Sequence, residues 1–379
     1  MNKATTVNKS RLLPDLMPKE AHKVHELLDR ARELFEKWGY WPVIPSLHQH
    51  RAAHLFRRNI QKEILDVVDQ NLKEVLYPMR FWYWGPVIRE DKKNQKKVSE
   101  GYELGIELVQ EEENISSIAE VISIAIELVR SLDIRDFRLI LGNQALFLAL
   151  SKSMENGGAR RIAILRGDES VLEEATRISS DPSVKQRVEA LKSLSRLVRE
   201  LGYKGTIQYD LNPFLGEEAY ASFIFRIESG FRAELVLWGG VRATSKFKMI
   251  GFSSDISQWV QIAEQIGSLT SSPKVDFLLV NRKQTKKSAI EMMRVLREHG
   301  YSVALDYSNY STEELLEFAK RTGILNLMVI GDEEAAINEV RLIDVADQVS
   351  IKLLISDIFD EKSGLNKLLR YHKRLEIDA

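Results

Sequence analysis

One arginine and two glutamates lie on consecutive apolar segments of this sequence and could together bind a small charged molecule. Arg89 ends an aromatic run that starts at Phe81, and Glu103 and Glu107 follow in the next segment, residues 100–109. If both segments are strands, the two glutamates share one face, because they are an even number of residues apart. A guanidinium facing carboxylates across two antiparallel strands can hold a zwitterion such as an amino acid, or a phosphate.

This stretch resembles motif 2 of the class II aminoacyl-tRNA synthetases, in the form found in histidyl-tRNA synthetases. The family pattern, roughly G-P-x-F-R-x-E, a basic loop and F-x-Q-x-G-x-E, aligns with this sequence without a gap. The resemblance implies that Arg89 takes the place of the arginine that contacts the ATP phosphate. It also implies that Glu103 and Glu107 line the histidine pocket, and that Ser99 replaces the basic residue of the loop.

Other catalytic positions of that family are changed here. The histidine-specific segment R-G-L-D-Y-Y-T falls on the segment that starts at Leu215, which replaces its arginine, and Tyr220 retains its last tyrosine. The arginine of motif 3 falls on Gln258, although Ser254 or Asp255 could still cap the helix that begins there. Preorganised arginines stabilise the charge that develops when a carboxylate attacks the α-phosphate of ATP, so the resemblance predicts that histidine activation is lost.

Composition limits the class of protein. The chain has 379 residues, with 54 Lys and Arg against 55 Asp and Glu, so no global basic field attracts nucleic acid. The absence of cysteine excludes disulfides, thiolate catalysis and cysteine-bound zinc, and fits a reducing, cytoplasmic environment. No apolar run reaches membrane-spanning length, and the histidines lack metal-ligand spacing. We therefore expect no membrane segment, no metal and no cofactor.

Residues 1–272 have the pattern of an antiparallel sheet flanked by helices. Apolar periodicity predicts helices over residues 20–38 and 115–132, and charged, helix-favouring residues over about 150–205 predict a helical insertion. Strands are expected at 40–44, 137–141, 205–209, 219–227 and 233–237. The first helix, Gly39 and the strand after it resemble motif 1 of the same family, which builds its dimer interface. A class II synthetase-like α+β fold and a homodimer are thus implied.

The pattern changes after the serine-rich segment 267–273, which predicts a domain boundary. From residue 273 to 379, strands alternate with helices, which favours a small, mostly parallel α/β domain. Strands are expected at 275–280, 303–305 and 325–330, and helices at 288–299 and 312–321. Residues 296–303 and 329–334 are similar to the anticodon-binding domain of histidyl, glycyl, threonyl and prolyl synthetases.

Structural roles stay open for several of these residues. Arg89 could pair with Asp91 or Glu107, and the two glutamates of the pocket could simply face solvent. The basic run 92–97 is typical of a solvated turn, and a phosphate-contacting loop is the alternative. Arg242, in a G-G-V-R segment that resembles the family's G-G-G-R turn, is expected to be structural.

Three functions are compatible with this pattern. The leading hypothesis is similarity to a non-catalytic paralogue of histidyl-tRNA synthetase, the regulatory subunit of short-form ATP phosphoribosyltransferase. That family keeps the synthetase fold, does not charge tRNA, activates a separate catalytic subunit and mediates feedback by histidine. The resemblance then implies a remnant histidine pocket of Arg89, Glu103, Glu107 and Tyr220. The alternatives are a divergent histidine–tRNA ligase and a synthetase-like module that binds RNA.

Overall fold

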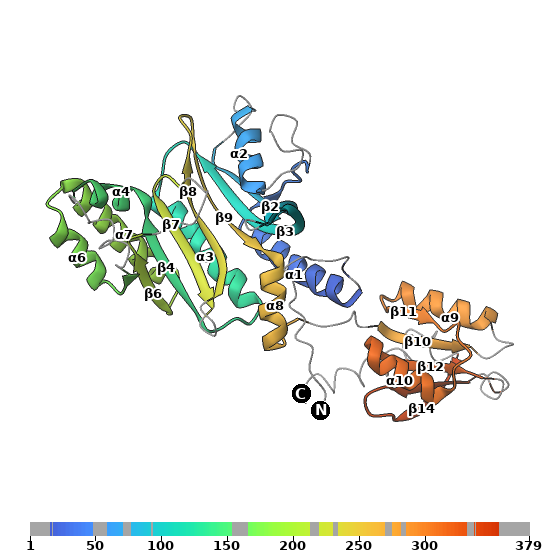
Figure 1. The fold of residues 1–379 in the computed structure, drawn as a ribbon. Coiled ribbons are helices and arrows are strands. Elements are labelled where there is room, and N and C mark those ends of the chain that lie inside the picture. Colours follow the sequence, from blue (N-terminus) through green and yellow to red (C-terminus); the bar gives the residue numbers. More distant parts are fainter. Residues whose placement is uncertain are drawn as a thin grey trace. The chain divides into compact units, whose positions relative to one another are not determined.

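The chain folds as two units, Met1–Thr270 and Ser271–Ala379, each with its own sheet (Figure 1). The computed structural model describes residues 16, 18–47, 59–70, 77–91, 94–153, 166–212, 220–229, 234–269, 275–281, 286–331, 337 and 339–355. Within these ranges, no helix combines the length and the apolar character needed to span a bilayer. The two units are described one after the other.

A nine-stranded sheet forms the first unit, in the order β1-β2-β3-β9-β8-β7-β4-β6-β5. Its strands are β1 (Trp41–Pro42), β2 (Met79–Asp91), β3 (Asn94–Gln110), β4 (Phe137–Asn143), β5 (Arg166–Gly167), β6 (Thr206–Asp210), β7 (Phe223–Ser229), β8 (Glu234–Ala243) and β9 (Lys248–Asp255). Neighbouring strands are antiparallel, except for the parallel pairs β1–β2 and β4–β6. The antiparallel sheet expected from the sequence is confirmed.

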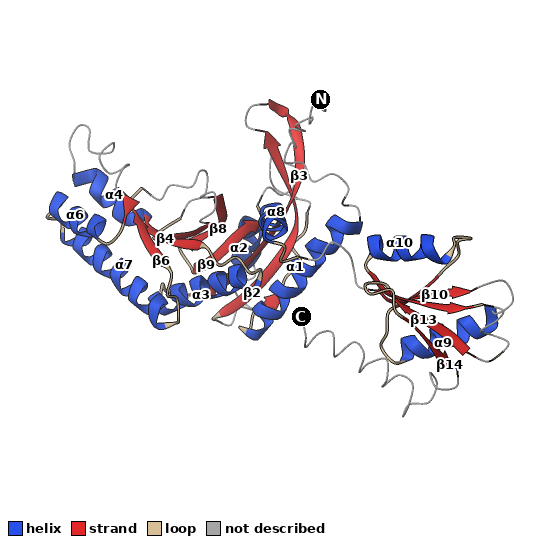
Figure 2. Ribbon diagram, turned by 90° about the horizontal axis from the view of Figure 1, so that it is seen from below, coloured by secondary structure: helices blue, strands red, loops and turns tan. Residues whose placement is uncertain are grey.

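Helices bury one face of this sheet in the main hydrophobic core. They are α1 (Pro18–Lys37), α3 (Ile115–Ser131), α4 (Gln144–Ser153), α6 (Ser170–Ile178), α7 (Pro182–Glu200) and α8 (Ile256–Ile266). Leu27 and Phe35 of α1 and Ile122 of α3 are fully buried in one cluster with Ile106 and Phe252 of the sheet. Figure 2 shows α1, α3 and α7 along the same side of the sheet. The helices expected over residues 20–38 and 115–132 are confirmed.

Another helix, α2 (Ile60–Gln70), packs on the opposite face of β2 and β3. Its residues Ile60, Ile64 and Val68 recur every four positions and are buried against Tyr83 and Val109. This spacing places all three on one side of the helix, so apolar burial holds α2 against the sheet. The sequence analysis makes no prediction for this segment, and α2 positions the candidate site.

The β2–β3 hairpin is longer than expected. Its pairing runs from Met79 and Val109 to Asp91 and Asn94, with an irregularity between Glu90 and Asp91. Residues 94–97, expected within a basic turn, therefore belong to β3, and of these residues Asn94 pairs with Asp91. Residues 92–93 lie outside the described part of the chain.

β1 is shorter than the strand expected at residues 40–44. It contains only Trp41 and Pro42, which pair with Phe81 and Trp82 of β2. The backbone N–H of Val43 still donates to the carbonyl oxygen of Trp82 at 2.9 Å, so one further hydrogen bond follows the strand.

The second unit is a mixed five-stranded sheet, in the order β11-β10-β12-β13-β14. Its elements are β10 (Val275–Asn281), α9 (Lys286–Glu298), β11 (Val303–Leu305), α10 (Thr312–Thr322), β12 (Ile324–Ile330), β13 (Glu339–Asp344) and β14 (Ser350–Leu354). Alternate residues of β10 pack on opposite faces, Phe277 with Met292 of α9 and Leu278 with Leu315 of α10 (Figure 2).

The expectation of a mostly parallel sheet is wrong in part of this unit. β10 is parallel to β11 and β12, as alternation with helices implies, whereas β12–β13 and β13–β14 are antiparallel. Antiparallel neighbours need no crossover helix, so helix–strand alternation gives no sign of them.

Candidate ligand pocket

Glu103 and Glu107 are buried beneath the first turn of α2. Their exposed fractions are 4% and 0%, so the alternative that they face solvent is wrong. The backbone N–H of Ile60 donates to Oε2 of Glu103 at 3.1 Å, and Nε2 of Gln61 donates to Oε1 of Glu107. A carboxylate is favourable at a helix N-terminus, where backbone N–H groups lack partners within the helix. Both glutamates therefore anchor the start of α2.

Arg242 of β8 links this helix to Tyr220. Its Nη2 donates to Oε1 of Gln61 at 2.6 Å and to the Tyr220 hydroxyl at 3.1 Å. The guanidinium carbon lies 4.5 Å from the centre of the Tyr220 ring, a cation–π geometry. Arg242 and Tyr220 are both buried, with 9% and 6% of their surface exposed. We call Glu107, Gln61, Arg242 and Tyr220 the pocket cluster.

Two glycines let this cluster lie directly against the sheet. Gly240 of β8 and Gly251 of β9 are opposed in the strand register. A Cβ on Gly251 would lie 2.2 Å from Oε2 of Glu107 and 2.1 Å from the carbonyl oxygen of Ile106. A Cβ on Gly240 would lie 2.7 Å from Cδ1 of Tyr220. Glycine is needed at both positions because the side chains of the cluster fill the space above the backbone.

Tyr83 lies on the same face of the sheet as Glu103 and Glu107, and nearby charges affect the pKa of its phenol. Its side chain is fully buried and its hydroxyl donates to the carbonyl oxygen of Phe252 at 3.4 Å. Burial raises the pKa of Tyr83 well above its usual range, and the carboxyls of Glu107 and Glu103 raise it further, whereas Arg242 opposes them. The phenol therefore stays neutral at physiological pH.

Ionisation of Tyr83 and Tyr40 is expected to lower the free energy of unfolding at alkaline pH. Burial is the largest cause of the raised pKa of each. The folded chain keeps these protons to higher pH than the unfolded chain, so their contribution is complete below about pH 10 and is lost as pH rises above it. Above about pH 10, each of the two groups lowers the free energy of unfolding by about 1.4 kcal/mol per pH unit. We expect the free energy of urea unfolding to fall less steeply above pH 10 in Tyr83→Phe than in wild type. Parallel curves would contradict this.

The structure does not place Arg89 opposite either glutamate. Arg89 pairs with Ser99 in the hairpin register, whereas Glu103 pairs with Gly85. Arg89 is thus four residues from Gly85, about 14 Å along a strand at ~3.4 Å per residue. The side chains of Arg89 and Ser99, and all of residue 215, lie outside the described part of the chain. Their roles in a phosphate site remain predictions.

Gln258 lies in the first turn of α8, close to the strand that carries the glutamates. Asp255, one of the two residues expected to cap this helix, is its N-cap and accepts the N–H of Ser257 at 2.9 Å. Asp255 also pairs with Glu103 in the β3–β9 register. Oε1 of Gln258 is buried and accepts no hydrogen bond from the described residues. A neutral amide at this position supplies no positive charge for a phosphate.

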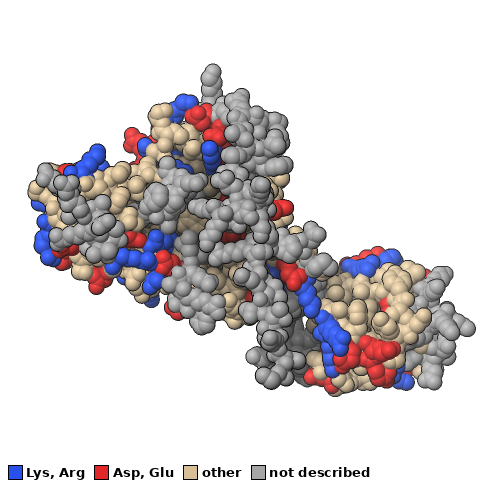
Figure 3. Space-filling view, in the orientation of Figure 1, with Lys and Arg blue, Asp and Glu red and all other residues tan. Residues whose placement is uncertain are grey.

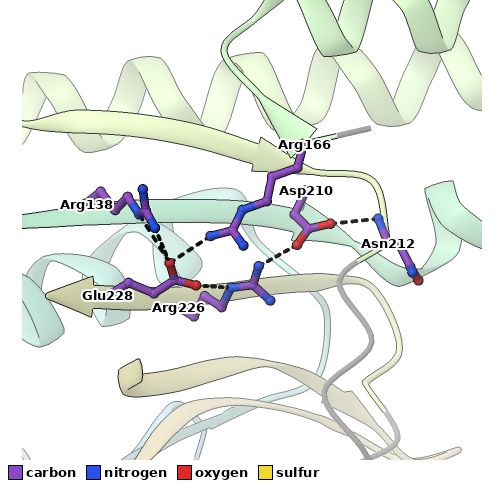
Figure 4. Close-up of polar contacts among 6 residues, drawn as sticks. All are labelled: Arg138, Arg166, Asp210, Asn212, Arg226 and Glu228. Atoms are coloured by element: carbon purple, nitrogen blue, oxygen red, sulfur yellow. Dashed lines mark hydrogen bonds and ion pairs between the residues drawn. The ribbon is translucent and has the colours of Figure 1, made fainter. Parts of the chain in front are cut away.

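A separate polar network spans the other half of the sheet (Figure 4). Oε2 of Glu228 contacts guanidinium nitrogens of Arg138 at 2.9 Å and Arg166 at 2.7 Å. Oε1 of Glu228 pairs with Arg226 at 3.0 Å, and Arg226 also pairs with Asp210. The residues come from β4, β5, β6 and β7, and all three guanidiniums are engaged by carboxylates. The network therefore ties four strands together.

Removing the central carboxylate of this network is expected to destabilise the first unit. Glu228 is only 7% exposed, so Glu228→Gln leaves three arginines facing a buried neutral amide. Breaking a buried pair on one side costs about 3–5 kcal/mol, and urea unfolding measures it. Glu189→Gln is the control, because Glu189 is 69% exposed and 3.8 Å from Lys192, and we expect a change under ~0.5 kcal/mol. Equal effects of the two variants would contradict a structural role for Glu228.

The sequence analysis missed two members of the pocket cluster. Gln61 lies in a segment without any recognised motif, so only the position of α2 reveals its contact with Glu107. Arg242 was expected to be structural, and it is buried against Tyr220, a residue expected in the pocket. The G-G-V-R pattern indicated the close backbone approach but not the direction of the arginine.

Comparison with known proteins shows what this fold is similar to. Residues 67–162 match the family model described as histidyl-tRNA synthetase, and residues 274–363 match the anticodon binding domain. The histidyl-tRNA synthetase of Nostoc sp. PCC 7120 has the same fold, with a TM-score of 0.77 at 16% identity over 94% of this chain and 98% of that one. The chain is histidyl-tRNA synthetase-like in both units. Its class II fold with an anticodon-binding-like domain is thus established.

Relatives of this histidyl-tRNA synthetase-like chain carry two different names. A Geobacter sulfurreducens protein named ATP phosphoribosyltransferase regulatory subunit is 22% identical over 93% of this chain and 95% of its own length. A Picosynechococcus protein named histidine–tRNA ligase is 26% identical over 69% of this chain and 68% of its own length. A Bacillus halodurans structure is described as an ATP phosphoribosyltransferase regulatory subunit/histidyl-tRNA synthetase. Its TM-score with this chain is 0.70 at 18% identity, and the match covers 87% of this chain and 99% of the Bacillus halodurans chain.

Proposed function

We propose that this chain is the regulatory subunit of an ATP phosphoribosyltransferase and has no ligase activity of its own. The observation that carries the proposal is the pocket cluster, whose buried side chains are engaged with one another by hydrogen bonds and a cation–π contact. Full-length similarity to proteins named as such regulatory subunits supports it. Their role in amino-acid biosynthesis favours a cytoplasmic location.

The electrostatics of the site also favour a non-catalytic role. Adenylate formation needs fixed positive charge at the α-phosphate. The two arginine positions of the synthetase family carry Leu215 and Gln258, and Arg242 is engaged by Gln61 and Tyr220. The described residues thus supply no obvious replacement guanidinium for a bound ATP.

The test is co-expression with a short-form ATP phosphoribosyltransferase catalytic subunit from the same genome. We expect the two chains to co-purify, and the catalytic rate to rise when this chain is present. Histidine, as the end product of the pathway, is the proposed inhibitor of the assembled enzyme. Absence of both co-purification and rate change would overturn the proposal.

A homodimer through the β1 edge of the first sheet is part of this proposal. Trp41 is 73% exposed, Ile44 93% and Trp84 40%, all at or beside the edge where β1 pairs with β2. Exposed aromatic and aliphatic side chains at a sheet edge favour association. Ile44→Asp and Trp41→Asp are expected to convert a dimer to a monomer in size-exclusion chromatography with light scattering. A wild-type monomer would contradict this.

RNA binding through the second unit is supported less well. Tyr307 is 88% exposed and Tyr310 49%, both just after β11, and such rings can stack on bases. On the face shown in Figure 3, however, the described basic side chains of this unit lie beside a patch of acidic ones, which would oppose a phosphate backbone there. A salt-dependent mobility shift with tRNA would favour this function instead.

A further inference from the structure

The second unit carries exposed aromatic rings where β11 leads into α10. Tyr307 is 88% exposed and Tyr310 49%, both in the loop between these elements, and Phe318 of α10 is 43% exposed. Large apolar side chains that are exposed close to one another mark interaction surfaces, and aromatic residues are enriched there. The loop and the helix after it therefore present rings that a partner can cover.

Local hydrogen bonds hold the loop that carries both tyrosines. Oδ1 of Asp306 accepts the N–H of Ser308 at 2.9 Å and its hydroxyl at 2.7 Å, and Oγ of Ser308 accepts the N–H of Tyr310 at 3.2 Å. The loop then ends in a capping box, in which the side chains of Ser311 and Glu314 each accept the other's N–H. A segment fixed in this way loses little conformational freedom when a partner binds.

Carboxylates lie beside these rings. Glu313 and Glu317 are exposed on the first two turns of α10, and Figure 3 shows acidic side chains gathered over this helix. Hydrogen bonds from its own backbone N–H and from Ser311 lower the pKa of Glu313, and the charge of Arg341 lowers it further. Glu313 is therefore negatively charged at neutral pH. We define the aromatic–acidic face as Tyr307, Tyr310, Glu313, Glu317 and Phe318.

The charges of this face select what it can bind. Glu313 and Glu317 repel the phosphates of RNA, although the exposed rings alone would suit a base. A guanidinium or an ammonium can pair with these carboxylates and also lie over an aromatic ring. The exposed basic residues of α10, Lys320 and Arg321, are in its last turn, at the end away from the tyrosines. The negative charge is thus concentrated at the end of the helix that adjoins the rings.

We propose that the aromatic–acidic face docks a basic segment, rich in arginine or lysine, of a partner protein. Arginine suits it better than lysine, because its planar guanidinium stacks on a ring and pairs with a carboxylate at the same time. This goes beyond the proposed function, since the face lies on the second unit and its test needs no ATP phosphoribosyltransferase. Failure of this test leaves the regulatory role standing, and failure of co-purification leaves the docking face standing.

Fluorescence anisotropy with a labelled peptide tests the proposal on the full chain. The probe has four arginines separated by serines, and its counterpart has glutamates in their place. We expect wild type to bind the arginine peptide and not the glutamate peptide in low salt. The double variant Tyr307→Ser and Glu317→Lys should weaken binding by about tenfold, since it removes a ring and reverses a charge. Circular dichroism of wild type and variant ensures that folded chains are compared.

A matched double variant on α9 is the control. Ile290 is 52% exposed and Glu291 is exposed, and α9 packs on the opposite face of the sheet from α10. Ile290→Ser with Glu291→Lys makes the same kind of change there, and we expect less than about a twofold effect on peptide binding. Equal weakening by both double variants would overturn the proposal, as would no binding of the arginine peptide to wild type. Binding of tRNA that the Tyr307→Ser and Glu317→Lys variant abolishes would also overturn it.

Discussion

Pure protein is expected to show no histidine-dependent exchange of pyrophosphate into ATP above background. Losing one preorganised charge-stabilising donor costs about 3–4 kcal/mol, or ~10²–10³ in rate. Two arginine positions of the synthetase family carry Leu215 and Gln258, so we expect a loss of about 10⁴–10⁶ if the effects add.

Restoring both arginines tests how much of the loss comes from the missing positive charge. The double variant Leu215→Arg and Gln258→Arg returns the missing charge but leaves the pocket cluster intact. We expect the double variant to remain inactive in the same exchange assay. Robust exchange by wild type would contradict the non-catalytic assignment, whereas exchange by the double variant alone would show that the pocket still admits histidine.

Gly251→Ala is expected to destabilise the first unit strongly. Its Cβ would lie 2.1 Å from the carbonyl oxygen of Ile106 and 2.2 Å from Oε2 of Glu107. The first of these atoms is backbone in the adjacent strand, so relief requires separating β3 from β9. Overpacking of a rigid interior costs about 1–3 kcal/mol or more, and we expect the upper end, above ~3 kcal/mol, in urea unfolding.

Gly39→Ala is the matched control for this substitution. Gly39 has φ +77° and nothing within 4 Å of an added Cβ, so only backbone strain of about 1–2 kcal/mol is expected. If Gly251→Ala costs no more than Gly39→Ala, the close packing of Glu107 on β9 is wrong. Far-ultraviolet circular dichroism of both variants before unfolding ensures that folded states are compared.

Local patterns predicted much of the fold because they report which face of an element is buried. Even spacing placed Glu103 and Glu107 on one face of β3, and helical periodicity located α1 and α3. The tertiary partner of each face is not a local property. Whether the glutamates meet solvent, a ligand or another helix depends on α2, which contacts them from more than forty residues away in the sequence.

The candidate site was predicted only in part for the same reason. Glu103, Glu107 and Tyr220 were expected in the site. For Arg89 to face the glutamates, the hairpin needs a strand register that the sequence does not fix. In the structure, the hairpin pairs Arg89 with Ser99. Arg242 was visible in the G-G-V-R segment and was expected to be structural, and only the structure shows that it packs on Tyr220.

The regulatory assignment is tested most directly by the rate of phosphoribosyl transfer from a short-form catalytic subunit, measured with and without this chain and, in parallel, by histidyl-tRNA formation with this chain alone. We predict a rate that rises with added chain and saturates at a fixed ratio of the two proteins, with no charged tRNA. Charged tRNA together with an unchanged rate of phosphoribosyl transfer would contradict it.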